Sequence, residues 1–228
     1  MKKLLYLPMA ALLMIACKKD NYQLSYPSVF YAIGVKEYKP LRVFAAKGEI
    51  KDDAVINRIE TNYVSFLDPD AIKRNNPVID TIYYRSASEA QVYSFQDGYY
   101  NKTFELRHDG NEFVFTAPSS YPAEMDTSLA SRIRVNCLYY PLLYDNKRDP
   151  VGPFYWYDFT DQIFASQISS DQLAIPTVVI MIQYSSGGGW ISLPINNRFN
   201  PHFDFRLLGP ADTFAVREYN LVMQKVEP

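Results

Sequence analysis

The chain has 228 residues, of which 23 are Lys or Arg and 25 are Asp or Glu, so its formal net charge at neutral pH is −2. This balance excludes the strongly basic surface of a typical nucleic-acid-binding protein, and we expect no nucleic-acid partner. Tyr and Phe are frequent, with 19 and 14 copies, and both residue types favour the half-buried faces of β-sheets.

The first sixteen residues have the pattern of a secretory signal peptide. Lys2 and Lys3 precede an apolar run over residues 4–16, which is shorter than the about 20 residues that a membrane-spanning helix needs. The sequence therefore predicts that residues 1–16 are removed. We expect residues 17–27 to form a tether and residues 28–228 to form a single β-rich domain.

Cys17 directly follows the small residue Ala16. Residues 14–17, Met-Ile-Ala-Cys, resemble the lipobox of bacterial lipoproteins, with Met14 in place of the commoner Leu. The resemblance implies cleavage before Cys17, a lipid on its thiol and an acylated amino terminus, and two or more acyl chains anchor a protein stably to a membrane. Residues 18–20, Lys-Lys-Asp, resemble short tags that send some Gram-negative lipoproteins to the outer face of the outer membrane. An ordinary secretory signal with an incidental cysteine is the alternative.

Two strands, over residues 29–35 and 41–46, are expected first. The spacing of the apolar residues then changes from that of a strand to that of a helix. Apolar residues recur at three- and four-residue spacing in the segment 52–66, at Val55, Ile56, Ile59, Tyr63 and Phe66. Asp52 and Asp53 stand where carboxylates cap and stabilise a helix N-terminus. The pattern predicts one short amphipathic helix over residues 52–66.

The rest of the chain has the composition of strands and turns. Strands are expected over residues 78–86, 91–95, 103–107, 112–116, 133–143, 154–159, 177–184, 190–195, 203–208 and 214–226. Asp109-Gly110 between alternating apolar residues predicts a hairpin, and the glycines at 187–189 predict another. Pro176 is expected at the start or edge of its strand, because it lacks a backbone N–H.

About ten short strands and one helix predict an all-β, mainly antiparallel fold. A β-sandwich is the first expectation, and a lipocalin-like β-barrel is the alternative. The segments "TFELRHDGNEFVF" and "REYNLVMQKVEP" resemble pieces of lipocalin-like bacterial lipoproteins. That resemblance implies a closed barrel with an apolar interior.

Few residues suggest catalysis or metal binding. Cys137 lies among apolar neighbours and is expected to be a buried small side chain, and His108 stands beside a predicted turn. His202 and Asp204 would share one face of a strand, but a zinc site needs at least one more ligand. We therefore expect no catalytic residues, no metal and no cofactor.

The segment 151–159, "VGPFYWYDF", holds the densest group of aromatic residues. On a strand these side chains occupy both faces, so one set can be left to bind a ligand or a partner. The predicted ligand-binding residues are Phe154, Tyr155, Trp156 and Tyr157, together with Trp190. The alternative is that both sets are buried.

These patterns favour a membrane-anchored envelope or cell-surface lipoprotein that is not an enzyme. We expect it to bind a glycan, a peptide or an envelope protein partner through an aromatic-rich surface. Two alternatives stay open: a glycan-degrading hydrolase with an acidic pair, and a lipocalin-like carrier of small apolar ligands.

Overall fold

A computed structural model describes residues 24–67, 79–94, 100–119, 121–126, 129–138, 146–148, 154–159, 162–192 and 194–226. Its strands are β1 (Ser28–Lys36), β2 (Arg42–Ala45), β3 (Gly48–Ile50), β4 (Thr81–Tyr84), β5 (Glu89–Ser94), β6 (Tyr100–Asp109), β7 (Glu112–Thr116), β8 (Tyr121–Asp126), β9 (Asn146–Arg148), β10 (Phe154–Phe159), β11 (Gln162–Gln167), β12 (Gln172–Gln183), β13 (Gly189–Ile191) and β14 (Thr213–Val226). Helices α2 (Asp53–Leu67) and α4 (Leu129–Asn136) and the 3₁₀ turn η1 (Phe205–Leu207) complete the described elements. Within these ranges, no helix has the length and apolar character needed to cross a membrane.

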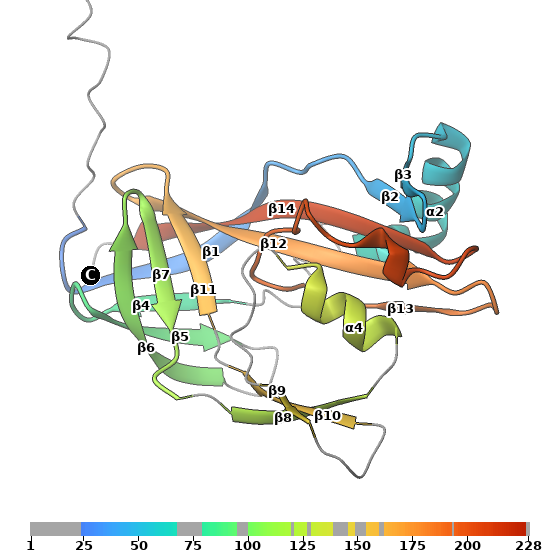
Figure 1. The fold of residues 1–228 in the computed structure, drawn as a ribbon. Coiled ribbons are helices and arrows are strands. Elements are labelled where there is room, and N and C mark those ends of the chain that lie inside the picture. The colour runs from blue at the N-terminus through green and yellow to red at the C-terminus, as the bar shows by residue number, and fades with distance from the viewer. Residues whose placement is uncertain are drawn as a thin grey trace, which may run out of the picture.

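Eight strands close into an antiparallel β-barrel (Figure 1). Around the barrel they follow the order β12, β11, β7, β6, β5, β4, β1, β14, and β14 pairs with β12 to complete the ring. The predicted all-β, antiparallel class is confirmed, but the predicted sandwich is wrong. The β12–β14 ladder, which runs from Gln172↔Gln224 to Gln183↔Thr213, joins what would otherwise be two open edges. The closed ring is compatible with the lipocalin-like alternative.

Aromatic side chains fill the described part of the barrel interior. Phe30, Tyr84, Phe104 and Phe115 are fully buried, and Phe113 is nearly so. The Tyr84 ring lies 5.5 Å from Phe30, 5.8 Å from Phe113 and 5.7 Å from Phe115, measured between ring centroids. An eight-stranded barrel encloses a space that side chains can just fill, and burial of each such ring stabilises the fold by roughly 1.5–3 kcal/mol. These rings therefore form a packed core.

The predicted β6–β7 hairpin is present, with its loop one residue further along the chain than Asp109-Gly110. Asp109 pairs with Glu112, so Gly110 and Asn111 form the loop. Gly110 has a φ of 64°, which is the conformation that the first loop position of a type II′ turn requires and that glycine adopts without strain. Phe104 and Leu106 of β6 and the Phe residues of β7 point into the barrel, as alternation predicts.

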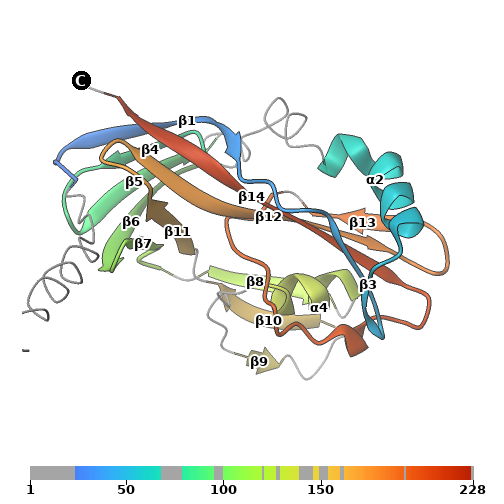
Figure 2. The same ribbon diagram turned by 90° about the horizontal axis from the view of Figure 1, so that it is seen from above.

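Strands β12 and β14 also belong to a second region, which we call the extension sheet, in the order β13, β12, β14, β2, β3. Val178, Ile180 and Ile182 of β12 pack on one face with Ile133 of α4. The intervening residues, among them Val179 and Met181, pack on the other face with Ile59 of α2. Figure 2 shows the two helices on opposite sides of the long strands. The period of two along one strand thus separates two apolar clusters.

Helix α2 matches the predicted segment within one residue at each end. The Asp52 carboxylate accepts a hydrogen bond from the Ala54 N–H at 2.8 Å, which satisfies one of the backbone donors that a helix N-terminus leaves open. Ile59 is 1% exposed, and Val55, Ile56 and Tyr63 pack against the same cluster. The predicted amphipathic helix is therefore confirmed.

Two predicted strands are wrong. Residues 133–136 belong to helix α4, and residues 139–143 of that predicted strand lie outside the described residues. Residues 205–207 form the turn η1, and the Asp204 side chain caps it by accepting from the Arg206 N–H. Both segments cover the same apolar face of the extension sheet, so burial against that face decides their conformation rather than local β-propensity.

The second hairpin is also confirmed. Gln183 of β12 pairs with Gly189 of β13, and Gly187 and Gly188 reverse the chain with φ values of 90° and 79°.

Pro176 lies inside β12, opposite Asn220 of β14. Val178 donates its N–H to the Ile195 carbonyl, on the side of β12 that faces away from β14. The Pro176 nitrogen points to the same side, because residues two apart in a strand have the same orientation. On that side, Pro176 lies past the last pair with β11, at Ala174, and before the bridge to Ile195. The proline therefore occupies a local edge.

Candidate functional site

The predicted aromatic residues lie in two different sheets. Phe154, Tyr155, Trp156 and Tyr157 belong to β10, which pairs with β8 and β9 in a separate three-stranded sheet. Trp190 belongs to β13 of the extension sheet, opposite Ile182. The side chains of all five lie outside the described residues, as does the whole of Cys17. The predicted ligand-binding and lipidation sites therefore stay predictions.

Neither histidine belongs to a metal-ligating group among the described residues. His108 is exposed beside the β6–β7 turn, with its ring 4.5 Å from that of Phe113. His202 and Asp204 lie in a turn rather than on the expected strand. Asp204 instead binds the Arg206 guanidinium at 2.8 Å, and this bond lowers the pKa of the Asp204 carboxyl. Within the described ranges, no three His, Cys, Asp or Glu side chains are grouped to hold a metal ion.

Cys137 is fully buried beside α4, in the cluster that covers the extension sheet. This location confirms the expectation of a small buried side chain. A reactive thiol needs access to solvent and a cationic neighbour. The Cys137 thiol is completely buried and therefore has no access to solvent.

A group of tyrosines lies on the outer surface of the barrel, where β1, β4 and β5 run side by side. Alternation explains their position: Phe30, Ile82 and Val92 point into the core, so the residues that follow each of them point outward. Those residues are Tyr31, Tyr83 and Tyr93. Tyr31 is 45% exposed, Tyr93 is 36% exposed, and Tyr83 is half-buried.

Strand register brings the three tyrosines together around Thr81. Thr81 lies directly opposite Tyr31 on one side and Tyr93 on the other. Tyr83 is two residues further along the same strand and therefore points to the same side. Neighbouring strands are about 4.8 Å apart, so Tyr31 and Tyr93 stand about 10 Å apart across β4. Three aromatic rings thus share one open face.

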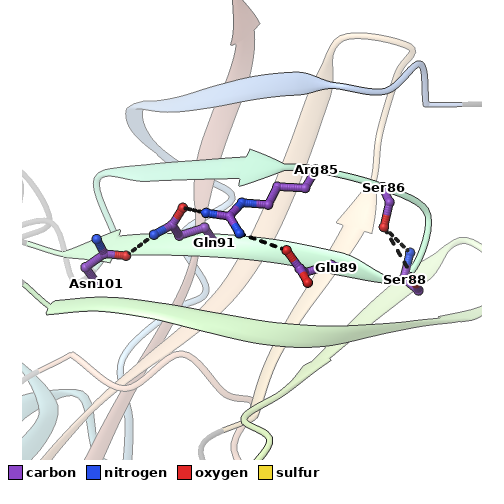
Figure 3. Close-up of polar contacts among 6 residues, drawn as sticks. All are labelled: Arg85, Ser86, Ser88, Glu89, Gln91 and Asn101. Carbon is purple, nitrogen blue, oxygen red and sulfur yellow. Dashed lines mark hydrogen bonds and ion pairs between the residues drawn. The ribbon is translucent and has the colours of Figure 1, made fainter.

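Polar side chains lie opposite two of these tyrosines, Gln91 beside Tyr83 and Asn101 beside Tyr93. Figure 3 shows the hydrogen-bonded row to which they belong. Arg85 donates to Glu89 Oε1 at 3.0 Å and to Gln91 Oε1 at 2.7 Å. Gln91 in turn donates from Nε2 to Asn101 Oδ1. We call Tyr31, Thr81, Tyr83, Gln91, Tyr93 and Asn101 the tyrosine face.

The Arg85 guanidinium sets the orientation of both amides in this row. A guanidinium only donates hydrogen bonds, so Gln91 turns its oxygen toward Arg85 and its nitrogen toward Asn101. Asn101 accepts through its oxygen, which leaves its amide nitrogen to act as a donor toward a ligand. The row therefore presents fixed hydrogen-bond groups beside apolar ring faces.

Sequence reasoning missed the tyrosine face, although a local signal existed. Each of the three tyrosines follows a β-branched or aromatic residue that points into the core, so its outward direction is readable once the strand is assigned. The three strands come together only through the register of β1, β4 and β5. Without that register, the continuous aromatic run at 154–159 gives the stronger signal.

Comparison with protein-family models, with curated proteins and with solved structures gave no match for this chain. Any functional conclusion therefore depends on its own residues and their geometry.

Proposed function

We propose that this protein is a lipid-anchored lipoprotein of the outer membrane or cell surface that binds carbohydrate on its tyrosine face and does not catalyse a reaction. The exposed cluster of Tyr31, Tyr83 and Tyr93 carries the binding part of the proposal. The lipobox-like segment 14–17 carries the anchoring part.

The chemistry of the face suits a sugar ring. A pyranose has apolar C–H faces and polar hydroxyl edges, and a ligand site for such a molecule combines flat aromatic surfaces with a few fixed polar groups. Tyr31 and Tyr93 supply the aromatic surfaces. Gln91 and Asn101, held in one orientation by Arg85, supply the polar groups.

Binding fits this surface better than hydrolysis does. A glycosidase holds the scissile bond between two carboxyl groups about 5–10 Å apart. Two acids beside the tyrosine face, Glu89 and Glu105, are neighbours on adjacent strands of the convex outer wall, and Glu89 is paired with Arg85. Two acids side by side on a convex wall do not enclose a glycosidic bond.

Affinity electrophoresis of the full-length protein in detergent, through gels that contain soluble polysaccharides, tests the binding. We expect retardation of the wild type and about tenfold or greater loss of affinity in Tyr31→Ala and Tyr93→Ala, because truncating a central aromatic contact costs about 2 kcal/mol or more. Tyr38→Ala is the matched control, since Tyr38 is also exposed, at 41%, but lies outside the face. Equal affinity in all four proteins would remove the tyrosine face as the site.

Mass spectrometry of the protein purified from bacterial membranes tests the anchor. We expect a mature chain that begins at Cys17 and carries the mass of its acyl groups, and a Cys17→Ala variant that leaves the membrane fraction. An unmodified Cys17 thiol, or cleavage at another position, would contradict the lipoprotein assignment.

A further inference from the structure

The tyrosine face lies within two rows of uncharged side chains. One row runs across the strands through Val29, Tyr83, Gln91 and Thr103, and the next runs through Gln224, Tyr31, Thr81, Tyr93 and Asn101. Strand register makes the members of each row direct neighbours. None of the described members of these two rows is ionic.

Carboxylates lie at the borders of these two rows. Glu89 and Glu105 face each other in the next row. Asp80 accepts a hydrogen bond from the Thr81 hydroxyl at 3.0 Å, and Asp171 accepts one from the Gln224 amide at 2.8 Å. Because like charges repel, these carboxylates oppose an anionic ligand.

Among the described residues, Arg85 is the cation that hydrogen-bonds to the face, and it is also paired with Glu89. The two terminal nitrogens of Arg85 each donate one hydrogen bond, one to Glu89 and the other to Gln91. A uronate or sulfate group could reach only the remaining N–H groups of this guanidinium, and it would then stand beside the Glu89 carboxylate. The charge arrangement therefore disfavours acidic polysaccharides.

From these observations we infer that the tyrosine face selects neutral, extended glycans and rejects anionic ones. This inference rests on the proposed function and adds the class of ligand. The chain of sugars crosses the strands from β1 to β5, with one ring on Tyr31 and another on Tyr93, because these are the exposed aromatic surfaces on either side of Thr81. A monosaccharide covers only one of the two rings and binds more weakly than an oligosaccharide.

The test compares neutral with anionic polymers on the full-length protein in detergent. The neutral polymers are amylose, xyloglucan and a mixed-linkage β-glucan, and the anionic ones are polygalacturonate and chondroitin sulfate. We expect retardation by at least one neutral polymer and by neither anionic polymer. The affinity for the neutral polymer should be insensitive to added NaCl, because salt screens only interactions between charges. Tyr31→Ala and Tyr93→Ala should each lower it about tenfold, with unchanged circular dichroism spectra.

The possible failures are distinguishable. Retardation by an anionic polymer that is lost in Tyr31→Ala would overturn the neutral selection but leave carbohydrate binding on this face. A steep fall of affinity with NaCl would do the same. Absence of retardation by every polymer would instead contradict the proposed function itself.

Discussion

At the residue scale, the hydroxyl of Tyr84 is an unusual member of the barrel core. The side chain is fully buried among phenylalanines, and among the described residues no group accepts from or donates to its Oη. Burial raises the pKa of the Tyr84 hydroxyl well above its ordinary value, so the group stays neutral. A buried hydroxyl without a hydrogen bond costs free energy that a phenylalanine ring would not.

We therefore expect Tyr84→Phe to keep or increase the free energy of unfolding, by up to about 1 kcal/mol. Tyr84→Ala, which also removes the ring, should lower it by about 3–5 kcal/mol. Urea denaturation of both variants measures the two changes. A loss of more than about 1 kcal/mol in Tyr84→Phe would show that the hydroxyl has a partner that stabilises the native state.

Asp212 is a second buried polar residue, but both of its carboxylate oxygens accept hydrogen bonds. Its carboxylate accepts from the Ser185 N–H at 2.8 Å and from the Gly209 N–H at 3.1 Å, and it therefore ties the β12–β13 loop to the segment before β14. The Ser185 N–H is the main cause of a lowered pKa of the Asp212 carboxyl. A lowered pKa in the folded state stabilises the protein above the ordinary carboxyl pKa of about 3.9.

That contribution is lost as the pH falls through the folded-state pKa, which lies below 3.9. We expect Asp212→Ala to lower the free energy of unfolding by about 1–3 kcal/mol at pH 7, and the difference from the wild type to shrink toward pH 3. Urea denaturation across this pH range measures it. A difference that stays constant with pH would mean that the charge of Asp212 has no role.

At the element scale, the N-terminus of α2 links a sequence pattern to a measurable stability. Asp52 caps the helix through its carboxylate, whereas the exposed neighbour Asp53 is the first helical residue. We expect Asp52→Ala to lower the free energy of unfolding by about 0.5–2 kcal/mol, and Asp53→Ala to lower it by less, since it loses only the favourable interaction with the helix dipole. Thermal unfolding of both variants compares them, and the reverse order would place the cap at Asp53.

Local sequence patterns predicted the elements whose conformation is determined by residues close together in the chain. Periodicity identified α2, and Asp109-Gly110 identified the β6–β7 hairpin, because both depend on neighbours in the chain. Helix α4 was missed because Ile133, Val135 and Cys137 have strand-like composition, although Ile133 and Cys137 are four residues apart and share one buried face. The conformation of such a segment depends on the surface that it covers, which local sequence does not contain.

The choice between barrel and sandwich depended on one non-local pairing. Strands were expected over residues 177–184 and 214–226, but nothing in either segment specifies the other as its partner. The tyrosine face also depends on non-local pairing, since the register of three strands brings Tyr31, Tyr83 and Tyr93 together. The aromatic binding surface predicted from the sequence lies on β10 and β13, and it stays a prediction.

At the scale of the whole molecule, β12 and β14 belong to both the barrel and the extension sheet. Leu173 and Ile175 of β12 point into the barrel core, while Ile180 and Ile182 of the same strand lie in the cluster covered by α4. Loss of either region therefore removes support from the strands of the other. We expect the barrel and the extension sheet to unfold in one cooperative transition.

Phe115→Ala in the barrel and Ile180→Ala in the extension sheet test this coupling. Each should lower the free energy of unfolding by about 2–5 kcal/mol and shift the same single transition, whether it is followed by far-ultraviolet circular dichroism or by hydrogen exchange. Two resolved transitions, with only one moved by each variant, would show that the two regions unfold independently.

The pairing of β14 with both β1 and β12 also constrains when the protein can fold. A nascent chain on the ribosome lacks β14 until residues 213–226 have been synthesised, long after the residues of β1. Contacts between such distant segments form slowly. Under the export that we propose for this chain, such a delay keeps the polypeptide unclosed until it has crossed the membrane.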